Sequence, residues 1–441
     1  MWRGGFKGGV HPGDHKELTS GKPIRIVEPP EQVVIPLSQH IGAPCTALVK
    51  KGDRVLVGQL IGDSNARLTA PVHSSVSGTV SGIVSIEAPG GRQVEAVSIT
   101  NDGQYEVSPD LKVDQDPLEM EPAEIIRRIR DAGIVGMGGA TFPTHFKLSV
   151  PEGKKIDTLI VNGVECEPFL TADHRLMLES GDEIVKGIRV AMRALKVQRA
   201  FIGIEENKPD AIETLSRILV GERSIEVVPL KVKYPQGAEK QLIKTVLNRE
   251  VPSGGLPLDV GVVVINVGTA AAIADALYRG MPLIRRVVTV TGSIVREPGN
   301  ILARIGTPVS HLVESCGGLT EDFGKVIVGG PMMGIAHHTL DTPVTKGMSG
   351  VLLYSKSESK VTEPTVCVRC GKCVQVCPMG LMPGILADMV DAGKCELAQR
   401  DHILDCIECG CCAYICPANR RIVQSIRLGK NEITRRRSQS A

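Results

Sequence analysis

Aromatic residues and long apolar runs are both scarce in this chain of 441 residues. Only 3% of the residues are aromatic, which disfavours stacking on nucleic-acid bases. The most apolar stretch, residues 260–274, is shorter than the roughly 18 to 20 residues of a membrane-spanning helix, so we expect no transmembrane helix. The Gly-rich N-terminus lacks the apolar segment of a secretory signal, so we expect a reducing cytoplasmic setting without disulfides.

The overall composition is that of a globular protein with several domains. Hydrophobic residues make up 42% and charged residues 23% of the chain, which excludes a disordered chain and a multi-span membrane protein. The length corresponds to about three domains. The 48 glycines and 28 prolines favour β or α/β folds with many tight turns.

Two kinds of pattern alternate along the chain. Short β-type runs between turn signals predict an all-β module from residue 33 to 100 and a second β-rich block at residues 286–354. Between these blocks, alternating strands and helices predict an α/β layer with a mainly parallel sheet. We expect helices at residues 122–131, 182–195 and 209–220, and strands at residues 158–161, 200–204, 225–228 and 262–267.

Ten of the 13 cysteines lie within residues 367–416, which indicates metal binding rather than disulfides. Two runs there share the spacing Cys-x2-Cys-x2-Cys-x3-Cys-Pro. This spacing is typical of two cubane [4Fe-4S] clusters in which the fourth cysteine of each run binds the cluster of the other run. The expected ligand sets are Cys367, Cys370, Cys373 and Cys416 for one cluster, and Cys377, Cys406, Cys409 and Cys412 for the other.

A pair of zinc sites is the alternative interpretation, but zinc usually binds CxxC pairs separated by a longer loop. Cys395 and Cys411 do not fit the ligand spacing, and we interpret them as packing residues. Apolar residues recur at helical spacing between the runs, so we expect helices around the clusters. Two clusters in one small domain form an electron wire, which needs a donor and an acceptor.

A glycine-rich loop and two acids mark the α/β region. Residues 133–144 read GIVGMGGATFPT and follow a predicted helix, whereas the Gly loop of a Rossmann fold follows a strand. Glycines let backbone amides approach a phosphate or a flat ring closely. The next predicted strand leads into Asn162, Glu165 and Glu167, at the position where α/β sheets place ligands. Solvated loop acids are the alternative, which spacing alone slightly favours.

The order and content of these segments resemble the NADH-binding flavoprotein subunit of respiratory complex I over about residues 120–350. The matching motifs begin at Gly136 (GxGGAxFPTxxK), Asn162 (NxxExEP), Tyr234 (YPQGAE) and Asn266 (NVGT). The resemblance implies an FMN and NAD(H) site with Glu165 and Glu167 as catalytic residues. The residues implied in cofactor binding are Gly136, Gly138, Gly139, Phe142, Lys147, Asn162, Glu165, Gly237, Glu239, Asn266 and Thr269.

Three residues depart from the pattern of that family. Met137 replaces an arginine, Val164 an aspartate and Ala238 a glutamate. Loss of the arginine removes a cationic hydrogen-bond donor. The departures therefore leave open a non-catalytic iron-sulfur wire protein with a decayed flavin site.

Together with the N-terminal motif FKGGVHP, which begins at Phe6, nearly the whole chain resembles the family of the C subunit of Rnf ion-translocating ferredoxin:NAD oxidoreductase complexes. The resemblance implies a peripheral subunit on the cytoplasmic face of the plasma membrane. It would pass electrons between NAD(H), FMN and two [4Fe-4S] clusters linked to a ferredoxin-like carrier, while other subunits move Na⁺ or H⁺. A cobalamin reductase of bacterial microcompartments, which shares the domain order, is the alternative.

The expected fold class is therefore multidomain α/β and β. The first β module is similar to a biotinyl/lipoyl-type barrel-sandwich hybrid, but its hairpin reads Asn65-Ala66-Arg67 without a lysine for a prosthetic group, so we expect a scaffold. The expected divisions are an N-terminal arm (1–29), a barrel-sandwich-hybrid-like β module (30–105), an α/β FMN/NADH-binding domain (115–270), a β-grasp ligand-binding module (271–355), a helix-rich two-[4Fe-4S] ferredoxin domain (360–419) and a basic tail (420–441).

Positive charge is concentrated at the end of the chain. The net charge is +2, but residues 420–441 contain six Arg and one Lys against one Glu, so the tail carries +6 and the rest of the chain −4. We expect a mobile tail that is either simply solvated or docks on an anionic membrane face or an acidic partner.

Overall fold

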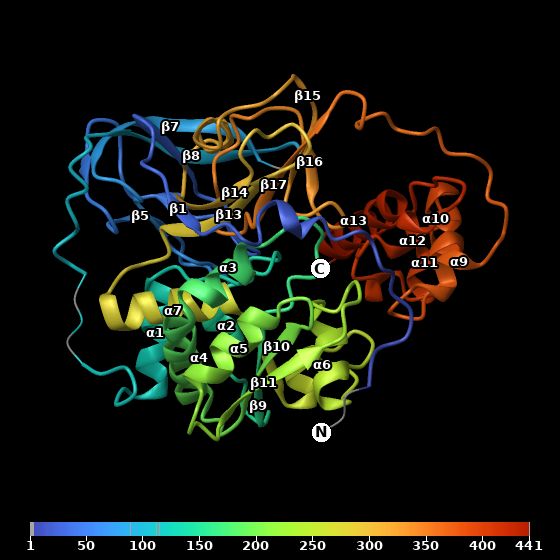
Figure 1. Cartoon of the computed structure of the whole chain (residues 1–441), viewed down its shortest axis with the longest axis horizontal. Helices are drawn as coiled ribbons and strands as arrows, with labels where there is room; N and C mark the ends of the chain where they lie inside the picture. The colour runs from blue at the N-terminus through green and yellow to red at the C-terminus, as the bar shows by residue number, and fades with distance from the viewer. Residues whose placement is uncertain (1–3, 89, 112, 114, 441) are drawn as a thin grey trace.

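Four β-sheets and a helical C-terminal region make up the part of the chain that the structure describes (Figure 1). The computed structural model describes residues 4–88, 90–111, 113 and 115–440. The first three residues of the predicted arm and the last residue of the predicted tail lie outside these ranges. None of the described helices combines the length and the hydropathy of a membrane span.

The first β module consists of a four-stranded antiparallel sheet of order β2-β8-β7-β4 and a three-stranded sheet of order β3-β5-β6. Its strands are β2 (Gln32–Pro36), β3 (Thr46–Ala47), β4 (Arg54–Val55), β5 (Leu60–Asp63), β6 (Val72–His73), β7 (Gly78–Ala88) and β8 (Arg92–Asn101). Val33, Ile35 and Ile99 are fully buried in the core of the module.

The α/β domain is built on the parallel sheet β11-β10-β9-β12, which confirms the predicted parallel layer. Its elements are α1 (Pro122–Asp131), α2 (Thr144–Leu148), β9 (Thr158–Asn162), α3 (Ala172–Glu179), α4 (Gly181–Leu195), β10 (Ala200–Glu205), α5 (Pro209–Ile218), β11 (Ile225–Leu230), α6 (Glu239–Leu247), β12 (Val262–Asn266) and α7 (Val267–Arg279). All four predicted strands and all three predicted helices are present to within a few residues. Helices α2, α3, α6 and α7 are additional to those predicted.

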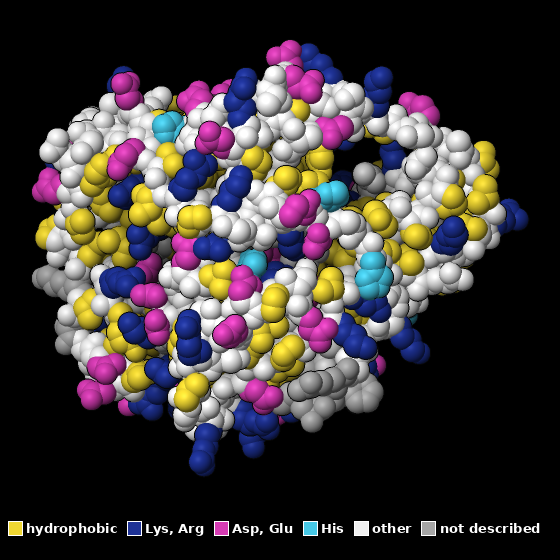
Figure 2. Space-filling model, viewed as in Figure 1, with side chains coloured by type: hydrophobic (Ala, Val, Ile, Leu, Met, Phe, Trp, Pro, Cys, Tyr) yellow, Lys and Arg dark blue, Asp and Glu magenta, His cyan; other side chains and the backbone are white. Residues whose placement is uncertain are grey.

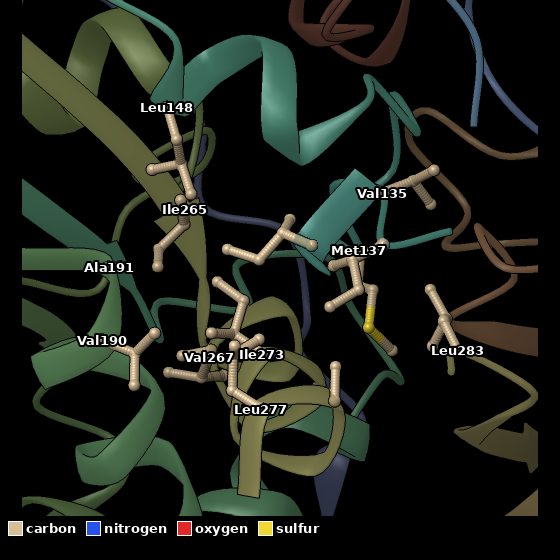
Figure 3. Packing of buried hydrophobic residues seen from close by; sticks show 14 of the residues in the cluster. Val135, Met137, Leu148, Val190, Ala191, Ile265, Val267, Ile273, Leu277 and Leu283 are labelled. Atoms are coloured by element: carbon tan, nitrogen blue, oxygen red, sulfur yellow. The ribbon is translucent and has the colours of Figure 1, made fainter. Parts of the chain in front are cut away.

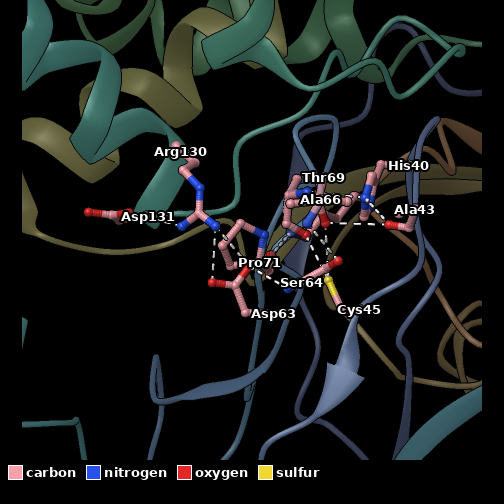
Figure 4. A network of polar contacts seen from close by, with 12 residues as sticks. His40, Ala43, Cys45, Asp63, Ser64, Ala66, Thr69, Pro71, Arg130 and Asp131 are labelled. Atoms are coloured by element: carbon pink, nitrogen blue, oxygen red, sulfur yellow. Dashed lines mark hydrogen bonds and ion pairs between the residues drawn. The ribbon is translucent and has the colours of Figure 1, made fainter.

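Polar contacts join the β module to the α/β domain (Figure 4). Arg130, on α1, donates from one guanidinium nitrogen to both carboxylate oxygens of Asp63 at 3.1 Å. The ammonium group of Lys346 is buried and donates to the carbonyl oxygens of Pro71 (2.6 Å) and Gly133 (2.7 Å). The β module is therefore fixed against the helical layer.

The third region is a six-stranded mixed sheet of order β1-β14-β13-β17-β15-β16. Its elements are β1 (Ile24–Ile26), β13 (Arg285–Thr291), β14 (Gly299–Arg304), α8 (Val309–Ser315), β15 (Phe323–Val328), β16 (Ile335–His337) and β17 (Gly350–Ser355). Strand β1 comes from the predicted N-terminal arm and pairs in parallel with β14, so the arm is part of the fold. The predicted boundary between residues 270 and 271 falls inside α7, which stays with the α/β domain because it packs on α4.

The C-terminal cysteine region is helical and lies beside the α/β domain (Figure 1). Its helices are α9 (Lys372–Gln375), α10 (Pro383–Asp391), α11 (Cys395–Arg400), α12 (Cys411–Tyr414) and α13 (Ile422–Ser440). Its apolar core includes Leu386, Ala398 and Ile403 from between the runs, as the helical spacing predicts.

The prediction of a mobile basic tail is wrong, because residues 422–440 form helix α13. Ile422, Ile426 and Ile433 are buried in the core of the cysteine region. Glu408 accepts hydrogen bonds from Arg427 (2.9 Å) and Lys430 (2.5 Å), so two of the basic residues have a local counter-charge. The apolar residues of this segment recur at helical spacing, and this signal outweighs the charge on which the prediction rested.

Candidate functional site

A cavity of about 820 Å³ lies where the four regions meet, above the carboxyl ends of β9 and β12. Such a volume fits a cofactor or a nucleotide. The β module contributes Gln39, His40 and Arg92 to its wall, and the cysteine region contributes Ile407. All predicted catalytic and cofactor-binding residues line it, namely Gly136, Gly138, Gly139, Phe142, Lys147, Asn162, Glu165, Glu167, Gly237, Glu239, Asn266 and Thr269.

The glycine-rich loop forms one wall of the cavity between α1 and α2. Gly139 has a φ of +116°, which is the left-handed range that favours glycine, and a Cβ there would meet no atom within 4 Å. The loop therefore presents open backbone to the cavity. The backbone N–H of Met137 donates to the hydroxyl oxygen of Thr269 at 2.9 Å, which fixes the loop against the start of α7.

Two asparagines at the ends of neighbouring strands organise the cavity floor. The side-chain amide of Asn162 donates to the carbonyl oxygen of Gly237 at 2.8 Å. Asn266 caps α7 by accepting from the N–H of Gly268 at 2.8 Å, and its own amide donates to Asp173 at 2.6 Å. Both asparagines are therefore held in fixed orientations by the protein.

The predicted phosphate-binding lysine already has an ionic partner. The ammonium group of Lys147 lies 2.7 Å from a carboxylate oxygen of Glu239 and 3.1 Å from the carbonyl oxygen of Val264. The pair is partly exposed, so its net stabilisation is small and Lys147 can exchange partners. Two further cations, Arg92 and Lys240, reach the cavity wall.

Glu165 and Asp173 form a half-buried acidic pair in the wall of the cavity. Glu165 accepts from the backbone N–H groups of Asp173 (2.7 Å) and His174 (3.1 Å), so it caps the start of α3. Burial, together with the charge of Glu165, raises the pKa of Asp173 to about 7. Glu165 also has a left-handed backbone with a φ of 46°, a conformation that is uncommon for a non-glycine residue. These acids are not the solvated loop acids of the alternative interpretation.

Glu167 and Tyr234 connect the cavity to the cysteine region. Glu167 accepts from the N–H groups of Met332 (3.0 Å) and Met333 (2.9 Å), and burial raises its pKa. The Tyr234 hydroxyl lies 2.7 Å from the carbonyl oxygen of Cys409 and 3.4 Å from Glu167. One side chain of the cavity wall thus contacts the backbone of a predicted cluster ligand.

The three departures from the flavoprotein pattern are all accommodated without new charges. Met137 is buried in the same apolar cluster as Val135 and Leu283 (Figure 3). Val164 is fully buried, and Ala238 precedes the first residue of α6. The cavity therefore forms in this chain although the chain lacks the arginine, aspartate and glutamate side chains of the flavoprotein pattern at these three positions.

The second cysteine run lies next to the cavity, together with one cysteine of the first run. Burial, together with the neighbouring Cys406, Cys409 and Cys377 thiols, raises the pKa of the Cys412 thiol to about 12. Cys377 is thus grouped with the three cysteines of the other run. The backbone N–H groups of Leu381 and Glu408 lie 3.4 Å from the Cys377 and Cys406 sulfurs, the kind of contact that tunes cluster potentials.

The first cysteine run lies on the outer side of the region. Cys367 and Cys370 are exposed, and so is the adjacent Val366. The two cysteines that do not fit the spacing, Cys395 and Cys411, are buried. No three His, Cys, Asp or Glu side chains of the described residues are grouped for a single metal ion; a cubane cluster spreads its cysteines around several iron atoms.

The residues present fit both implied groups. The open glycine backbone and the cavity volume suit a flavin nucleotide, and the grouped thiols with N–H donors suit a cubane cluster. Asp173, Tyr234 and Arg92 also line the cavity, although none of them is among the predicted site residues. Tyr234 begins the predicted motif YPQGAE, whereas Arg92 lies in the first β module, where no sequence motif marks it as a site residue.

Matches to protein-family models cover most of the chain. Residues 4–104 match the RnfC barrel sandwich hybrid domain, and residues 129–275 match the Nuo51 FMN-binding domain. Residues 287–336 match the SLBB domain, and residues 359–417 match the 4Fe-4S dicluster domain. The four matches follow the order of the four regions of the fold.

Two curated relatives are similar to the chain over nearly its whole length. The chain is 48% identical to the C subunit of the Na(+)-translocating ferredoxin:NAD(+) oxidoreductase complex of Acetobacterium woodii, over 98% of each chain. It is 50% identical to the C subunit of the proton-translocating ferredoxin:NAD(+) oxidoreductase complex of Clostridium ljungdahlii, over 97% of this chain and 93% of the relative.

A solved structure of an NAD+-reducing [NiFe]-hydrogenase in the air-oxidized state shares the fold, with a TM-score of 0.51 and 20% identity. The match covers 73% of this chain and 63% of the hydrogenase chain. At this identity the likeness concerns the fold alone.

Proposed function

Because the chain belongs to the family of the C subunit of ion-translocating ferredoxin:NAD(+) oxidoreductase complexes, we propose that it passes electrons between NAD(H) and two [4Fe-4S] clusters by way of FMN in the cavity. The contact of Tyr234 with Cys409 carries this proposal, because it joins the cavity wall to a cluster loop within one hydrogen bond. When bound, FMN would exchange two electrons with NAD(H) and single electrons with the clusters.

The residues of the cavity would bind and orient the nucleotides. The exposed backbone at Gly138 and Gly139 would accept phosphate or the flavin ring, with Lys147 exchanging Glu239 for a phosphate oxygen. Gly136, whose N–H donates to the carbonyl oxygen of Phe142 at 2.8 Å, would hold the shape of the loop. Asn162, Gly237, Asn266 and Thr269 would border the flavin, and Phe142 and Glu239 would lie nearer the nicotinamide nucleotide. Glu165 would border the flavin, and Glu167, which contacts Tyr234, would act from the side of the cavity that faces the clusters.

The two clusters would act in a fixed order. The cluster of Cys377, Cys406, Cys409 and Cys412, which we call the inner cluster, would lie beside the cavity. The cluster of Cys367, Cys370, Cys373 and Cys416, the outer cluster, would lie behind it, near the surface where Cys367 and Cys370 are exposed. A redox partner would therefore exchange electrons with the outer cluster first.

The partners follow from the family. Relatives are named as subunits of ion-translocating complexes, so we propose that this chain docks on other subunits of such a complex and works with a ferredoxin-like carrier. A position at the cytoplasmic face of the membrane would let the exposed surface around Cys367 meet that carrier. The ion movement would belong to other subunits.

Cofactor analysis of anaerobically purified protein tests this function. We expect about eight iron atoms, about eight sulfides and about one flavin per chain, and we expect NADH to bleach the iron-sulfur absorbance. Thr269→Val tests the flavin site because it removes the hydroxyl acceptor that fixes the glycine loop through Met137. Thr434→Val is the matched control, because the Thr434 hydroxyl bonds only within α13 among the contacts described. Full iron content without flavin and without bleaching by NADH would instead support the wire protein with a decayed flavin site.

A further inference from the structure

The N-terminal motif FKGGV is not used by the proposed electron path, yet it bonds both to the Tyr234 segment of the cavity wall and to the loop before Cys377. Residues 6–10, which we call the strap, run between α6 and the C-terminal helices (Figure 1). Phe6 and Val10 are buried at 7% and 5% exposure. Residues near a chain end are usually exposed unless other parts of the fold hold them. The burial of Phe6 and Val10 therefore indicates contacts with neighbouring elements.

One side of the strap is bonded to the cavity wall. Val10 and Tyr234 exchange two backbone hydrogen bonds of 2.9 and 3.0 Å in an antiparallel bridge. The ammonium group of Lys233 donates to the carbonyl oxygen of Phe6 at 2.9 Å and lies 4.5 Å from the centre of its ring. The strap therefore holds the same Tyr234 whose hydroxyl contacts Cys409.

The other side of the strap is bonded to the loop of a cluster ligand. The backbone N–H of Gly9 donates to the carbonyl oxygen of Val376 at 2.8 Å, and Val376 directly precedes Cys377. Gly8 has a φ of +72°, and a Cβ at this position would lie 2.7 Å from the carbonyl oxygen of Cys377. The chain backbones approach so closely here that only glycine fits.

We infer that the strap positions the inner cluster against the cavity by tying the loops of two of its ligands, Cys377 and Cys409, to the cavity wall. The strap would thereby fix the Cys377 loop, and with it the inner cluster, relative to the cavity wall. The inference rests on the proposed function for the cluster ligands. It gives the FKGGV motif a positioning role that acts through backbone contacts with Tyr234 and Val376.

Substitutions at two glycines in the full-length, anaerobically purified protein test this inference. Gly8→Ala places a methyl group against the Cys377 carbonyl in a left-handed backbone, whereas a Cβ at Gly5 meets nothing within 4 Å and Gly5→Ala is the matched control. We expect iron of the inner cluster to reach a chelator about tenfold faster in Gly8→Ala, which corresponds to roughly 1.4 kcal/mol. We also expect an altered EPR signal of the inner cluster and an unchanged signal of the outer cluster.

Lys233 provides a milder variant in case Gly8→Ala fails to fold. Lys233→Met removes the contact to Phe6 and should accelerate iron release from the inner cluster about threefold, whereas Lys233→Arg, which can keep the contact, should behave like the parent. A role in folding alone would not change the EPR signal of one cluster selectively. If Gly8→Ala and Lys233→Met both match the Gly5→Ala control in iron release and EPR, the strap has no positioning role. If the Gly5→Ala control itself holds no iron-sulfur cluster, the proposed function fails together with the inference.

Discussion

The two cysteine runs have the same spacing but opposite surroundings. Cys409 and Cys412 of the second run are each 7% exposed and lie behind the cavity wall, whereas Cys367 and Cys370 of the first run are exposed. Buried thiolates bonded to backbone N–H groups and exposed thiolates give clusters of different potential. One motif, used twice, can therefore supply an inner and an outer electron carrier because the fold covers only one of them.

The largest effects are expected when single cysteines are replaced by serine. Each replacement should remove one cluster and leave the other in place. Cys377 belongs to the first run by sequence but groups with the thiols of the second run. We therefore expect Cys377→Ser to remove the inner cluster and about half of the iron, and to stop reduction of the outer cluster by NADH. Cys416→Ser should remove the outer cluster and leave the inner one reducible. EPR and iron analysis would contradict the cross-ligation if each variant lost the cluster of its own run.

A change in the cavity should affect electron entry while both clusters stay loaded. Lys147→Ala removes the cation proposed for phosphate, and a lost charge-assisted hydrogen bond should weaken flavin binding about ten- to hundredfold. Lys154, which is also bonded to a carboxylate, Asp259, at 2.8 Å, gives the control Lys154→Ala. Flavin fluorescence after dialysis and iron content are the measurements. Equal flavin retention in the two variants would remove Lys147 from the site.

An acid in the cavity and an acid in the cysteine region should contribute to protein stability with opposite pH dependence. The pKa of Asp173 is raised to about 7, so its unfavourable ionisation removes stability as the pH rises from about 4 to about 7. Although burial opposes it, hydrogen bonds and charges from Lys430 and Arg427 lower the pKa of Glu408 in the cysteine region. Its stabilisation is therefore present above about pH 4.5 and is lost as the pH falls below that value.

Thermal unfolding between about pH 3 and about pH 8 measures this contrast. Asp173→Asn should gain stability relative to the parent toward pH 8, and Glu408→Gln should lose stability relative to the parent at neutral pH but not at low pH. Parallel profiles for the parent and both variants would contradict these assignments.

The smallest expected effect concerns the basic helix α13. On the face shown in Figure 2, basic and acidic side chains are interspersed over the molecule. Arg435 and Arg436 contact Glu432 at 3.0 and 2.7 Å, so part of their charge is compensated. Replacing Arg435, Arg436 and Arg437 by Gln should let salt release the protein from anionic vesicles at slightly lower concentration. The matching Lys replacements should leave the salt curve unchanged, and identical curves for both sets would exclude a role for these charges.

Several features of this protein can be predicted from its sequence because they depend on spacing along the backbone. The repeated cysteine spacing indicates the composition of each cluster, including the exchanged Cys377 and Cys416 that we propose. The alternation of strands and helices predicts the parallel sheet, and the motifs from Gly136 to Thr269 indicate the cavity residues. Short helices such as α2 and α3 escape prediction because their patterns are too brief to show a period.

Other features become visible only in the folded chain, because they join residues that are distant along the sequence. Lys147 is paired with Glu239, Asp173 is half-buried near Glu165, and Tyr234 contacts Cys409, all through packing that no local pattern records. Helix α13 is held in place because its isoleucines are buried in the cysteine region. The order of residues thus limits which side chains can carry the chemistry, and the packing of four regions around one cavity sets which cysteine run is covered and which is exposed.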